Sequence, residues 1–550
     1  MKKRDSKTKG KIVDVSRGPA LSDEDFKGSW FECVPKDPGP PTNGARNHSR
    51  VDIESAAKVA MDEACEAYAQ RLGKNGQKQF RRTMAKAGTV MDRVAALTLV
   101  VQESPIHHLN ELRELINLAP KTMKYTKRSA LEALKDLFIH DLLPPSRKLV
   151  SLEMCKDLHP NSLKRVLVYA WFESELKKLF SIFVDHLKSF MSHSVVHHRL
   201  HSMKVAVSLL MERPEQEERL LELIINKMGD PERKIASSAS HLLTILLKEH
   251  SAMKSVVVTE VLQFLHRTGL NDRTKHYAVS YLAQLRFTSN DRLLARKMIE
   301  SYLSLFEDAL LISDGDPAKK EQSHKLVAAI LTGCNRAFPF AESETWNSID
   351  SKFDGLFKVA HSSSLAAAVQ ALTLLFQVSR SRSNVSDRFY RALYERFSRS
   401  DIPTSTKQGS VLRLVYQSVS ADEHEPRAMA FCKRLLQSAT QSSPSFAAGC
   451  LRVLWEIIAR RRKQPFRRAV AETKGAEFTR KSVSRNDSDP YATNEELENY
   501  KIDHRDPAFA NAHRSSFWEL VALSRHFHPS VSHFCRDILN LTRIKYDGDP

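Results

Sequence analysis

The sequence is poor in the residues and patterns that build β-sheets. Glycine, on which tight hairpin turns depend, accounts for only 17 of the 550 residues. The alternation of apolar and polar residues that marks a half-buried strand is almost absent. These two shortages argue against a β-sandwich or a β-barrel. Between about residue 51 and residue 460 the pattern instead predicts one helix after another.

Cysteine is scarce, and long apolar runs are missing. The seven cysteines are scattered, odd in number and nowhere spaced as Cys-x-x-Cys. That usage is typical of buried thiols in a reducing compartment and argues against a disulfide framework. Residues 1–11 are basic but lead into no apolar core, so they do not form a secretory signal. The longest uncharged run, 362–379, is interrupted by Ser, Gln and Thr and predicts a buried helix rather than a membrane span.

Catalytic signatures are also missing. The sequence has no Walker loop, no dinucleotide-binding glycine fingerprint, no Gly-x-Ser-x-Gly and no His-Glu-x-x-His. His526, His528, His533 and Cys535 lie close together, but their spacing matches no familiar zinc module. We therefore expect no metal ion, no cofactor, and a binding scaffold rather than an enzyme. The histidines are expected to shape a turn between two helices.

What the sequence has in excess is positive charge. Lys and Arg together number 84 against 65 for Asp and Glu, which leaves a formal net charge of +19. A surplus of this size favours polyanion partners, with nucleic acid ahead of an anionic membrane. The plainer alternative is a basic soluble protein whose surplus charge serves no partner.

Similar segments recur at intervals of roughly 40 residues. Ala371–Phe376 is echoed by Val411–Tyr416 and again by Leu451–Trp455. Such a period is typical of HEAT and armadillo arrays, in which each helix pair buries its apolar stripe against the next pair. The sequence therefore predicts an all-α fold, with a HEAT/armadillo-like α-solenoid over residues 51–460. The alternative is an irregular all-helical domain.

The regions outside the repeats differ in composition. Residues 1–50 show little periodicity and predict a disordered basic arm, in which Trp30 and Phe31 anchor either a partner or the protein's own core. Residues 461–498 predict a basic flexible linker. Residues 499–550 return to an ordered pattern. We expect this helical segment to dock on the end of the solenoid, because about 50 residues make a poor core alone.

The sharpest candidate for phosphate contact is a basic cluster where the solenoid meets this linker. Arginine forks grip phosphates, and an aromatic side chain can stack on an unpaired base. A solvated linker or a localisation signal is the alternative. A second basic stretch precedes a predicted helix. The candidate RNA-binding residues are Arg460, Arg461, Arg462, Lys463, Phe466, Arg467 and Arg468, and in the second stretch Lys124, Lys127 and Arg128.

The most distinctive pattern lies near the end of the sequence, where His, Pro, Trp and paired charges occur at fixed offsets. Weaker blocks precede it in order, at residues 97–105, 130–144, 226–236 and 331–339. Together these blocks resemble the CCAAT-binding-factor/maintenance-of-killer family of nucleolar complex proteins. Lys501 departs from the family pattern, which has Asp at that position. The three parts of the pattern are Tyr500 to Phe509 with Arg505-Asp506-Pro507, Phe517-Trp518-Glu519-Leu520, and His526-Phe527-His528-Pro529.

The resemblance implies a non-catalytic factor for assembly of the large (60S) ribosomal subunit, located in the nucleus and nucleolus. The partners it implies are pre-ribosomal RNA, pre-60S assembly factors and a second helical-repeat nucleolar complex protein, with no membrane. Trp518 is expected to be buried, so that its truncation would loosen the segment or a partner contact. The residues expected to shape this segment or to contact a partner are Tyr500, Asp503, Arg505, Asp506, Pro507, Phe509, Trp518, Glu519, His526, His528 and Pro529.

Two further expectations follow from the resemblance. The family's name leaves open a CCAAT-box transcriptional regulator that binds DNA, although the sequence has no recognisable groove-reading helix module and no basic region followed by heptads. Relatives continue beyond the point where this sequence stops, so its C-terminus is expected to be incomplete.

Overall fold

The described part of the chain is helical, and none of it forms a β-strand. The chain divides into two compact units, residues 1–268 and 269–550. The prediction of an all-α fold built from stacked helices is therefore confirmed. The computed structural model describes residues 30–32, 50–72, 89–119, 124–155, 158, 162, 164–311, 317–341, 352–362, 364–382, 385–397, 401–461, 464–478 and 500–544.

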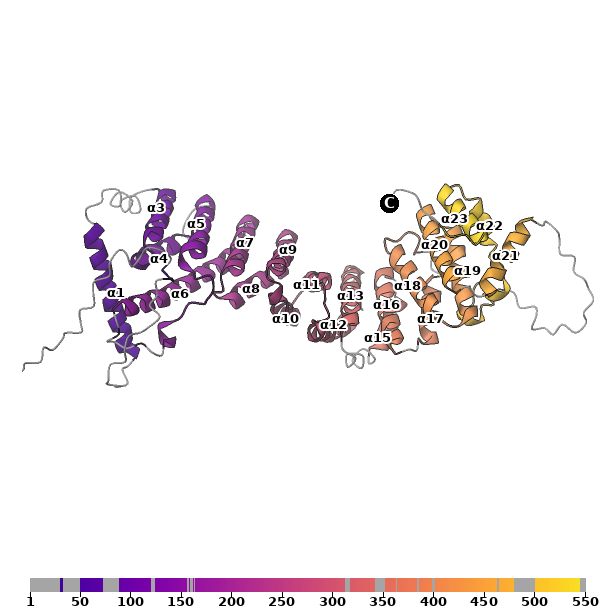
Figure 1. The fold of residues 1–550 in the computed structure, drawn as a ribbon, viewed down its shortest axis with the longest axis horizontal. Helices are drawn as coiled ribbons and strands as arrows, with labels where there is room; N and C mark the ends of the chain where they lie inside the picture. The colour runs from indigo at the N-terminus through magenta and orange to yellow at the C-terminus, as the bar shows by residue number, and fades with distance from the viewer. Residues whose placement is uncertain are drawn as a thin grey trace, which may run out of the picture. The chain divides into compact units, whose positions relative to one another are not determined.

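The first unit consists of two layers of stacked helices (Figure 1). In one layer α3 packs on α5, α5 on α7, and α7 on α9, while in the other α4 packs on α6, and α8 on α10. Helix α1 packs against α6. The bounds are α1 Arg50–Leu72, α3 Val90–Glu103, α4 Leu109–Leu118, α5 Lys124–Leu137, α6 Lys164–Met191, α7 Val196–Glu212, α8 Glu217–Asn226, α9 Arg233–Glu249 and α10 Lys254–Leu265.

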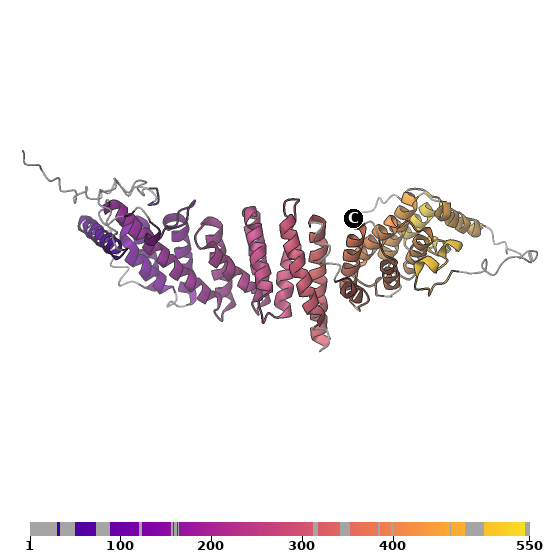
Figure 2. The ribbon, with the colours of Figure 1, turned by 90° about the horizontal axis from the view of Figure 1, so that it is seen from below.

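The second unit repeats this two-layer arrangement (Figures 1 and 2). Helices α11, α13, α16, α18 and α20 pack side by side in one layer, and α12, α15, α17 and α19 form the other. The bounds are α11 Asp272–Gln284, α12 Arg292–Leu311, α13 Pro317–Ala337, α15 Phe353–Ala360, α16 Leu365–Ser381, α17 Asp387–Phe397, α18 Gln408–Ala421, α19 Glu425–Thr440, α20 Pro444–Arg461, α21 Gln464–Phe478, α22 Glu519–Ser524 and α23 Pro529–Leu539.

Local signals in the sequence set several helix ends. Thr89 begins α3 with a capping box, in which its hydroxyl accepts from the Asp92 amide at 3.3 Å and the Asp92 carboxylate accepts from the Thr89 amide at 3.2 Å. At the other end of several helices, a basic side chain from the next repeat reaches the last carbonyl groups. The His250 ring lies 2.8 Å from the carbonyl oxygen of Met211 near the end of α7. Such contacts satisfy carbonyls that the helix leaves unpaired.

The predicted anchor in the N-terminal arm packs on the protein's own core. Trp30 is buried, and its ring nitrogen donates to the carbonyl of Leu142 at 2.9 Å. Its ring meets that of Phe172 edge-on, with the centroids 4.9 Å apart. The remainder of the predicted arm lies outside the described residues, apart from Phe31, Glu32 and Arg50.

The predicted linker over 461–498 contains a helix, so its first part is corrected. Helix α20 ends at Arg461, and α21 packs against α22 and α23. Pro465 stands in the first turn of α21, where its missing N–H costs nothing. Phe466, Ala469, Val470 and Thr473 follow at helical spacing and are all buried. That apolar stripe was readable in the sequence, but the arginines around it obscured it. Residues 479–498 lie outside the described part.

Candidate functional site

The C-terminal segment, residues 500–544, packs on the last repeat of the second unit. Its short 3₁₀ helix η9, Pro507–Phe509, and helix α22 lie against α19, while α23 lies against α20. The family pattern noted in the sequence is therefore the part of the chain that closes this end of the helix stack.

A buried ion pair joins this segment to α19. The Lys433 ammonium lies 2.9 Å from a Glu519 carboxylate oxygen and donates to the carbonyl of Ser516 at 2.6 Å. The two side chains are 0% and 1% exposed. The rings of Tyr500 and Trp518 complete the surroundings of the ammonium, with centroids 5.8 Å and 5.2 Å away. Glu519 thus has a defined structural role.

Burial disfavours the charged form of both side chains. Loss of hydration lowers the pKa of Lys433 and raises the pKa of Glu519, while the attraction and hydrogen bond between them oppose both shifts. Each charge is therefore stable in this position only while the other is present. Sequence reasoning missed Lys433. The available signal was the pair Lys433-Arg434 inside the otherwise apolar stretch Ala428–Leu436.

Three further contacts hold the segment on the repeat. Arg434 donates to the Ile502 carbonyl at 2.5 Å, and its guanidinium lies 4.2 Å from the Tyr394 ring centroid. The Tyr500 hydroxyl donates to the side-chain oxygen of Gln437 at 3.3 Å. The Phe517 amide donates to the Thr473 hydroxyl of α21 at 2.9 Å. The segment is thus tied to both α19 and α21.

The Arg505-Asp506-Pro507 part of the pattern forms a capped turn. Asp506 accepts from the Ala508 amide at 3.0 Å and so caps η9, while Pro507 is buried at the first position. Asp506 also lies 3.9 Å from Arg391, and Arg505 lies 3.5 Å from Glu395. These two ion pairs connect the turn to α17.

A groove of about 800 Å³ lies beside this turn. Its walls come from α17, the turn at 403–404, α19 and the loop 502–505. Arg434 and Arg505 face Glu395 and Asp503 around it, so the groove has no charge of one dominant sign. Asp503 thus lines a surface groove.

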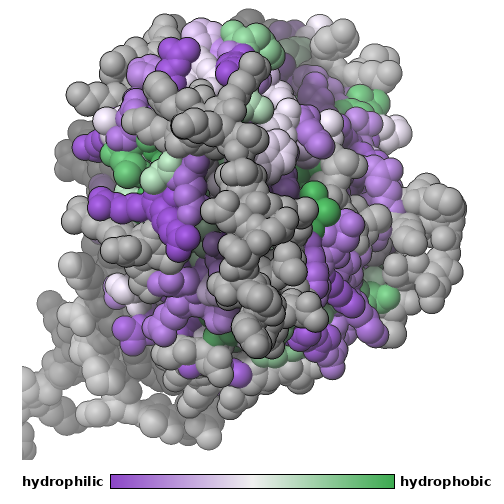
Figure 3. All heavy atoms as spheres, turned by 90° about the vertical axis from the view of Figure 1, so that its right-hand side faces the viewer, coloured by the Kyte–Doolittle hydropathy of each residue, from purple (hydrophilic) through white to green (hydrophobic). Residues whose placement is uncertain are grey.

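The segment exposes three aromatic side chains. Phe509 is 67% exposed, Trp518 58% and Phe527 82%. The expectation that Trp518 is buried was therefore wrong. Its neighbour Phe517 is fully buried instead, because the chain enters α22 with Phe517 facing the core. Figure 3 looks onto this end of the second unit, where hydrophilic side chains dominate the described surface and hydrophobic ones form small separate groups.

The histidines near the end of the sequence shape the turn between α22 and α23. The His528 amide donates to the ring nitrogen of His526 at 3.0 Å, and Pro529 opens α23. Cys535 is buried in α23. Over the described ranges, no group of three or more His, Cys, Asp or Glu side chains is placed to hold a metal ion. No described helix is long and apolar enough to cross a membrane.

The basic cluster at 460–468 separates into three kinds of residue. Arg460, Arg467 and Arg468 are exposed, and Arg468 pairs with Glu472 at 2.8 Å. Phe466 is fully buried, so the expectation that it stacks on a base was wrong: it belongs to the apolar stripe of α21. Arg461 donates to the carbonyls of Val419 and Asp422. Arg462 and Lys463 lie outside the described residues.

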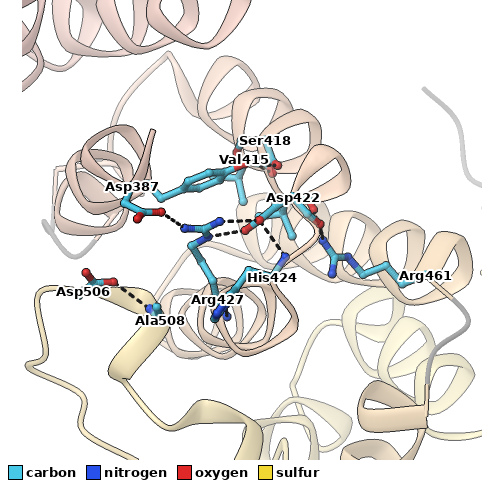
Figure 4. A network of polar contacts seen from close by, with 11 residues as sticks. Asp387, Val415, Ser418, Asp422, His424, Arg427, Arg461, Asp506 and Ala508 are labelled. Atoms are coloured by element: carbon cyan, nitrogen blue, oxygen red, sulfur yellow. Dashed lines mark hydrogen bonds and ion pairs between the residues drawn. The ribbon is translucent and has the colours of Figure 1, made fainter. Parts of the chain in front are cut away.

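Figure 4 shows how Arg461 joins a polar network between repeats. Arg427, in the first turn of α19, donates twice to the Asp422 carboxylate at 2.6 and 2.7 Å, and once to Asp387 of α17 at 2.5 Å. The guanidinium lies 4.0 Å from the Tyr390 ring centroid. Arg461 approaches the end of α18 from α20. The network therefore connects α17, α18, α19 and α20.

The second basic stretch opens α5. Arg128 is exposed on that helix, whereas the side chains of Lys124 and Lys127 lie outside the described residues. The structure therefore brings Arg128 to the first unit and the 460–468 cluster to the second, which gives two separate candidate surfaces.

These features define a helical-repeat protein whose last repeat is covered by a C-terminal segment, which a buried ion pair connects to that repeat. Residues 368–535 match the CBF/Mak21 family, a range that includes both Lys433 and Glu519. The chain belongs to that family.

The chain is similar in sequence to three named relatives. CCAAT/enhancer-binding protein zeta of Homo sapiens is 34% identical, and the match covers 86% of this chain and 50% of the human protein. Ribosome biogenesis protein NOC1 of Chaetomium thermophilum is 31% identical over 96% of this chain and 58% of its own length. Nucleolar complex protein 1 of Drosophila melanogaster is 26% identical over 96% and 50%. The chain spans about half the length of the curated relatives it matches.

Proposed function

We propose that this protein is a nucleolar ribosome-biogenesis factor that acts in assembly of the large subunit. The observation that carries the proposal is its similarity, over nearly its whole length, to proteins named as a ribosome biogenesis protein and a nucleolar complex protein. In this proposal the protein is a non-catalytic scaffold. Its helix stacks offer extended surfaces of the kind that hold a partner without chemical change.

Its first proposed partner is pre-ribosomal RNA. The net charge of +19 supports this, because neutralised phosphates release counterions and so drive binding. Exposed arginines in the second unit, including Arg460 and Arg467, supply cations that no described acidic side chain pairs.

Its second proposed partner is another nucleolar complex protein with helical repeats, within a set of pre-60S assembly factors. Phe509, Trp518 and Phe527 support this, because exposed aromatic side chains are common anchors of protein interfaces. The rigid docking of the segment on α19 would present those side chains at little entropic cost.

A CCAAT-box transcriptional regulator remains the competing proposal, since one relative is named CCAAT/enhancer-binding protein zeta. The experiment that separates the two is crosslinking of the tagged protein to RNA in cells, with sequencing of the RNA and identification of co-purifying proteins. We expect crosslinks concentrated on large-subunit precursor RNA, together with a helical-repeat partner in near-equal amount. Scattered or absent crosslinks with recovery of chromatin proteins would favour the regulator.

A further inference from the structure

One layer of the second unit has an unusual charge pattern on its solvent side. Helices α13, α16, α18 and α20 pack in sequence in this layer, and α15, α17 and α19 of the other layer alternate with them along the chain. We propose that the outer face of these four helices binds the backbone of RNA. The inference rests on the proposed function and names the surface that would carry its RNA contact.

Four arginines give this face its charge: Arg336, Arg380, Arg413 and Arg460. All four are exposed, one on each helix. Within the described part of the chain, none of them forms an ion pair. Arg336, Arg380 and Arg460 each stand one residue before the end of their helix, and so occupy the same level in the layer.

Acidic side chains are nearly missing from the same helices. Helices α16 and α18 contain no Asp or Glu. The one acid of α13, Glu321, pairs with Lys325 at 2.7 Å, and the one acid of α20, Glu456, pairs with Arg452 at 2.7 Å. The positive potential of the four arginines is therefore not cancelled on this face.

The opposite layer uses its charges differently. There Lys352 of the turn before α15 pairs with Glu307 of α12, and Arg388 of α17 pairs with Asp354 of α15 at 2.9 Å. Those ion pairs connect neighbouring helices, whereas none of the four arginines pairs with a neighbouring helix. The other layer also exposes unpaired cations, such as Lys297 and Lys358, but its helices carry acidic side chains three or four residues away, Glu300 and Asp354. The contrast lies within one unit and one amino-acid composition, so overall basicity does not explain it.

The helix dipole offers a partial alternative explanation. A cation in the last turn of a helix is stabilised by about 0.3–1 kcal/mol, which would account for Arg336, Arg380 and Arg460. It does not account for Arg413, which lies near the middle of α18, nor for the missing acids. Tyr416 and Gln417 lie three and four residues after Arg413, on the same side of the helix, and add uncharged donors next to it.

This surface is suited to contact with the RNA backbone rather than to recognition of base edges. Neighbouring helices are ~8–10 Å apart, so the four arginines extend over ~25–30 Å, long enough for several successive phosphates. Arginine and uncharged donors suit phosphate and ribose oxygens, which carry no sequence code. We therefore expect binding that depends strongly on salt and weakly on sequence.

The test compares two charge-matched variants of the full chain. The surface variant carries Arg336→Gln, Arg380→Gln, Arg413→Gln and Arg460→Gln. The control removes four exposed cations of the same unit that lie outside these four helices and also form no ion pair within the described part. It carries Arg292→Gln, Lys297→Gln, Lys358→Gln and, directly after α22, Arg525→Gln.

The readout is binding of a fluorescent RNA hairpin with a single-stranded flank, measured over a range of salt concentrations. In the surface variant we expect the slope of log affinity against log salt to fall by about 3 units, because four phosphate contacts are lost, with affinity about tenfold weaker or more. The control should change affinity less than about twofold. Thermal unfolding should be the same for all three proteins, because all eight side chains are exposed.

The outcomes separate this inference from the function on which it rests. If the unmodified protein binds no RNA, both fail. If it binds RNA and the two variants weaken binding equally, the face is not the RNA site, although the function stands. If the surface variant retains RNA binding but loses binding to polyglutamate, the face takes an acidic protein and the inference is overturned. Ultraviolet crosslinking of the unmodified protein, with RNA-bearing peptides expected from α13, α16, α18 and α20, provides a check that needs no variant.

Discussion

Lys433 and Glu519 lie 86 residues apart in the chain and 2.9 Å apart in the fold, with both side chains removed from solvent. Their contact is the point at which the C-terminal segment is joined to the helix stack. A buried pair of this kind contributes less net stability than its short distance suggests, because both charges have lost their hydration. It does make the two residues depend on each other.

Replacement of Lys433 or Glu519 alone by Met should cost ~3–5 kcal/mol, because the remaining charge stays buried without a partner. The double Met variant should cost less than either single variant, since no charge is then left in the core. Urea unfolding of the unmodified protein, the two single variants and the double variant measures the free energies of this double-mutant cycle. Additive costs in the double variant would show that the two side chains act independently.

Phe517 and Trp518 should respond very differently to truncation. Phe517→Ala should cost ~3–5 kcal/mol because the ring is fully buried. Trp518→Ala should cost only about 1 kcal/mol, which is the loss of its contact with the Lys433 ammonium. Thermal unfolding measures both. If the Trp518 variant proves as unstable as the Phe517 variant, the exposed position of Trp518 is wrong.

Arg460 and Arg461 should separate RNA binding from stability. Arg461→Gln should cost ~1.5–3 kcal/mol, because the carbonyls of Val419 and Asp422 lose a charged donor. Arg460→Gln should change stability by less than about 0.5 kcal/mol, since its side chain is exposed, but should lower the salt dependence of RNA binding. Unfolding and RNA titration of each variant give the comparison. A loss of stability in the Arg460 variant, with a lowered salt dependence of RNA binding in the Arg461 variant, would contradict this prediction.

His201 should make stability fall as the solution is acidified. Burial is the main cause that lowers the pKa of this histidine, and the nearby Glu132 only partly offsets it. The unfolded chain therefore takes up a proton first, near pH 6.5, and stability is lost as the pH falls from there through the lower folded pKa. The melting temperature of the unmodified protein should fall as the pH is lowered from 7.5 to 5.5. His201→Gln should reduce that slope, by at most about 1.4 kcal/mol per pH unit.

The control for this experiment is His197→Gln, on the same helix but exposed. Its charge is only one of the smaller causes that lower the pKa of His201, so this variant should change the pH dependence of the melting temperature less than His201→Gln does. Equal slopes in all three proteins would exclude His201 as a contributor.

The sequence predicted some features of this protein well and others poorly. The sequence was sufficient for the all-α fold, because apolar spacing is a local property. It was also sufficient for the docking of the last segment, because about 50 residues make a poor core alone. It was not sufficient for Phe466, whose arginine neighbours suggested a base-stacking role although the ring is buried. It was also not sufficient for Lys433, since a cation in an otherwise apolar stretch shows that a partner is needed without showing which one.

The amino-acid sequence by itself determined that this protein is a basic helical-repeat chain of the CBF/Mak21 family. Period, composition and family pattern are all carried by residues close together in the chain. Only the tertiary structure decided which arginines contact helix ends and which face solvent, which of two adjacent aromatic rings is buried, and that Glu519 pairs with Lys433. Those outcomes depend on what a distant segment places against each side chain. A rotation of about 100° per residue along a helix is enough to move a neighbour from the core to the surface.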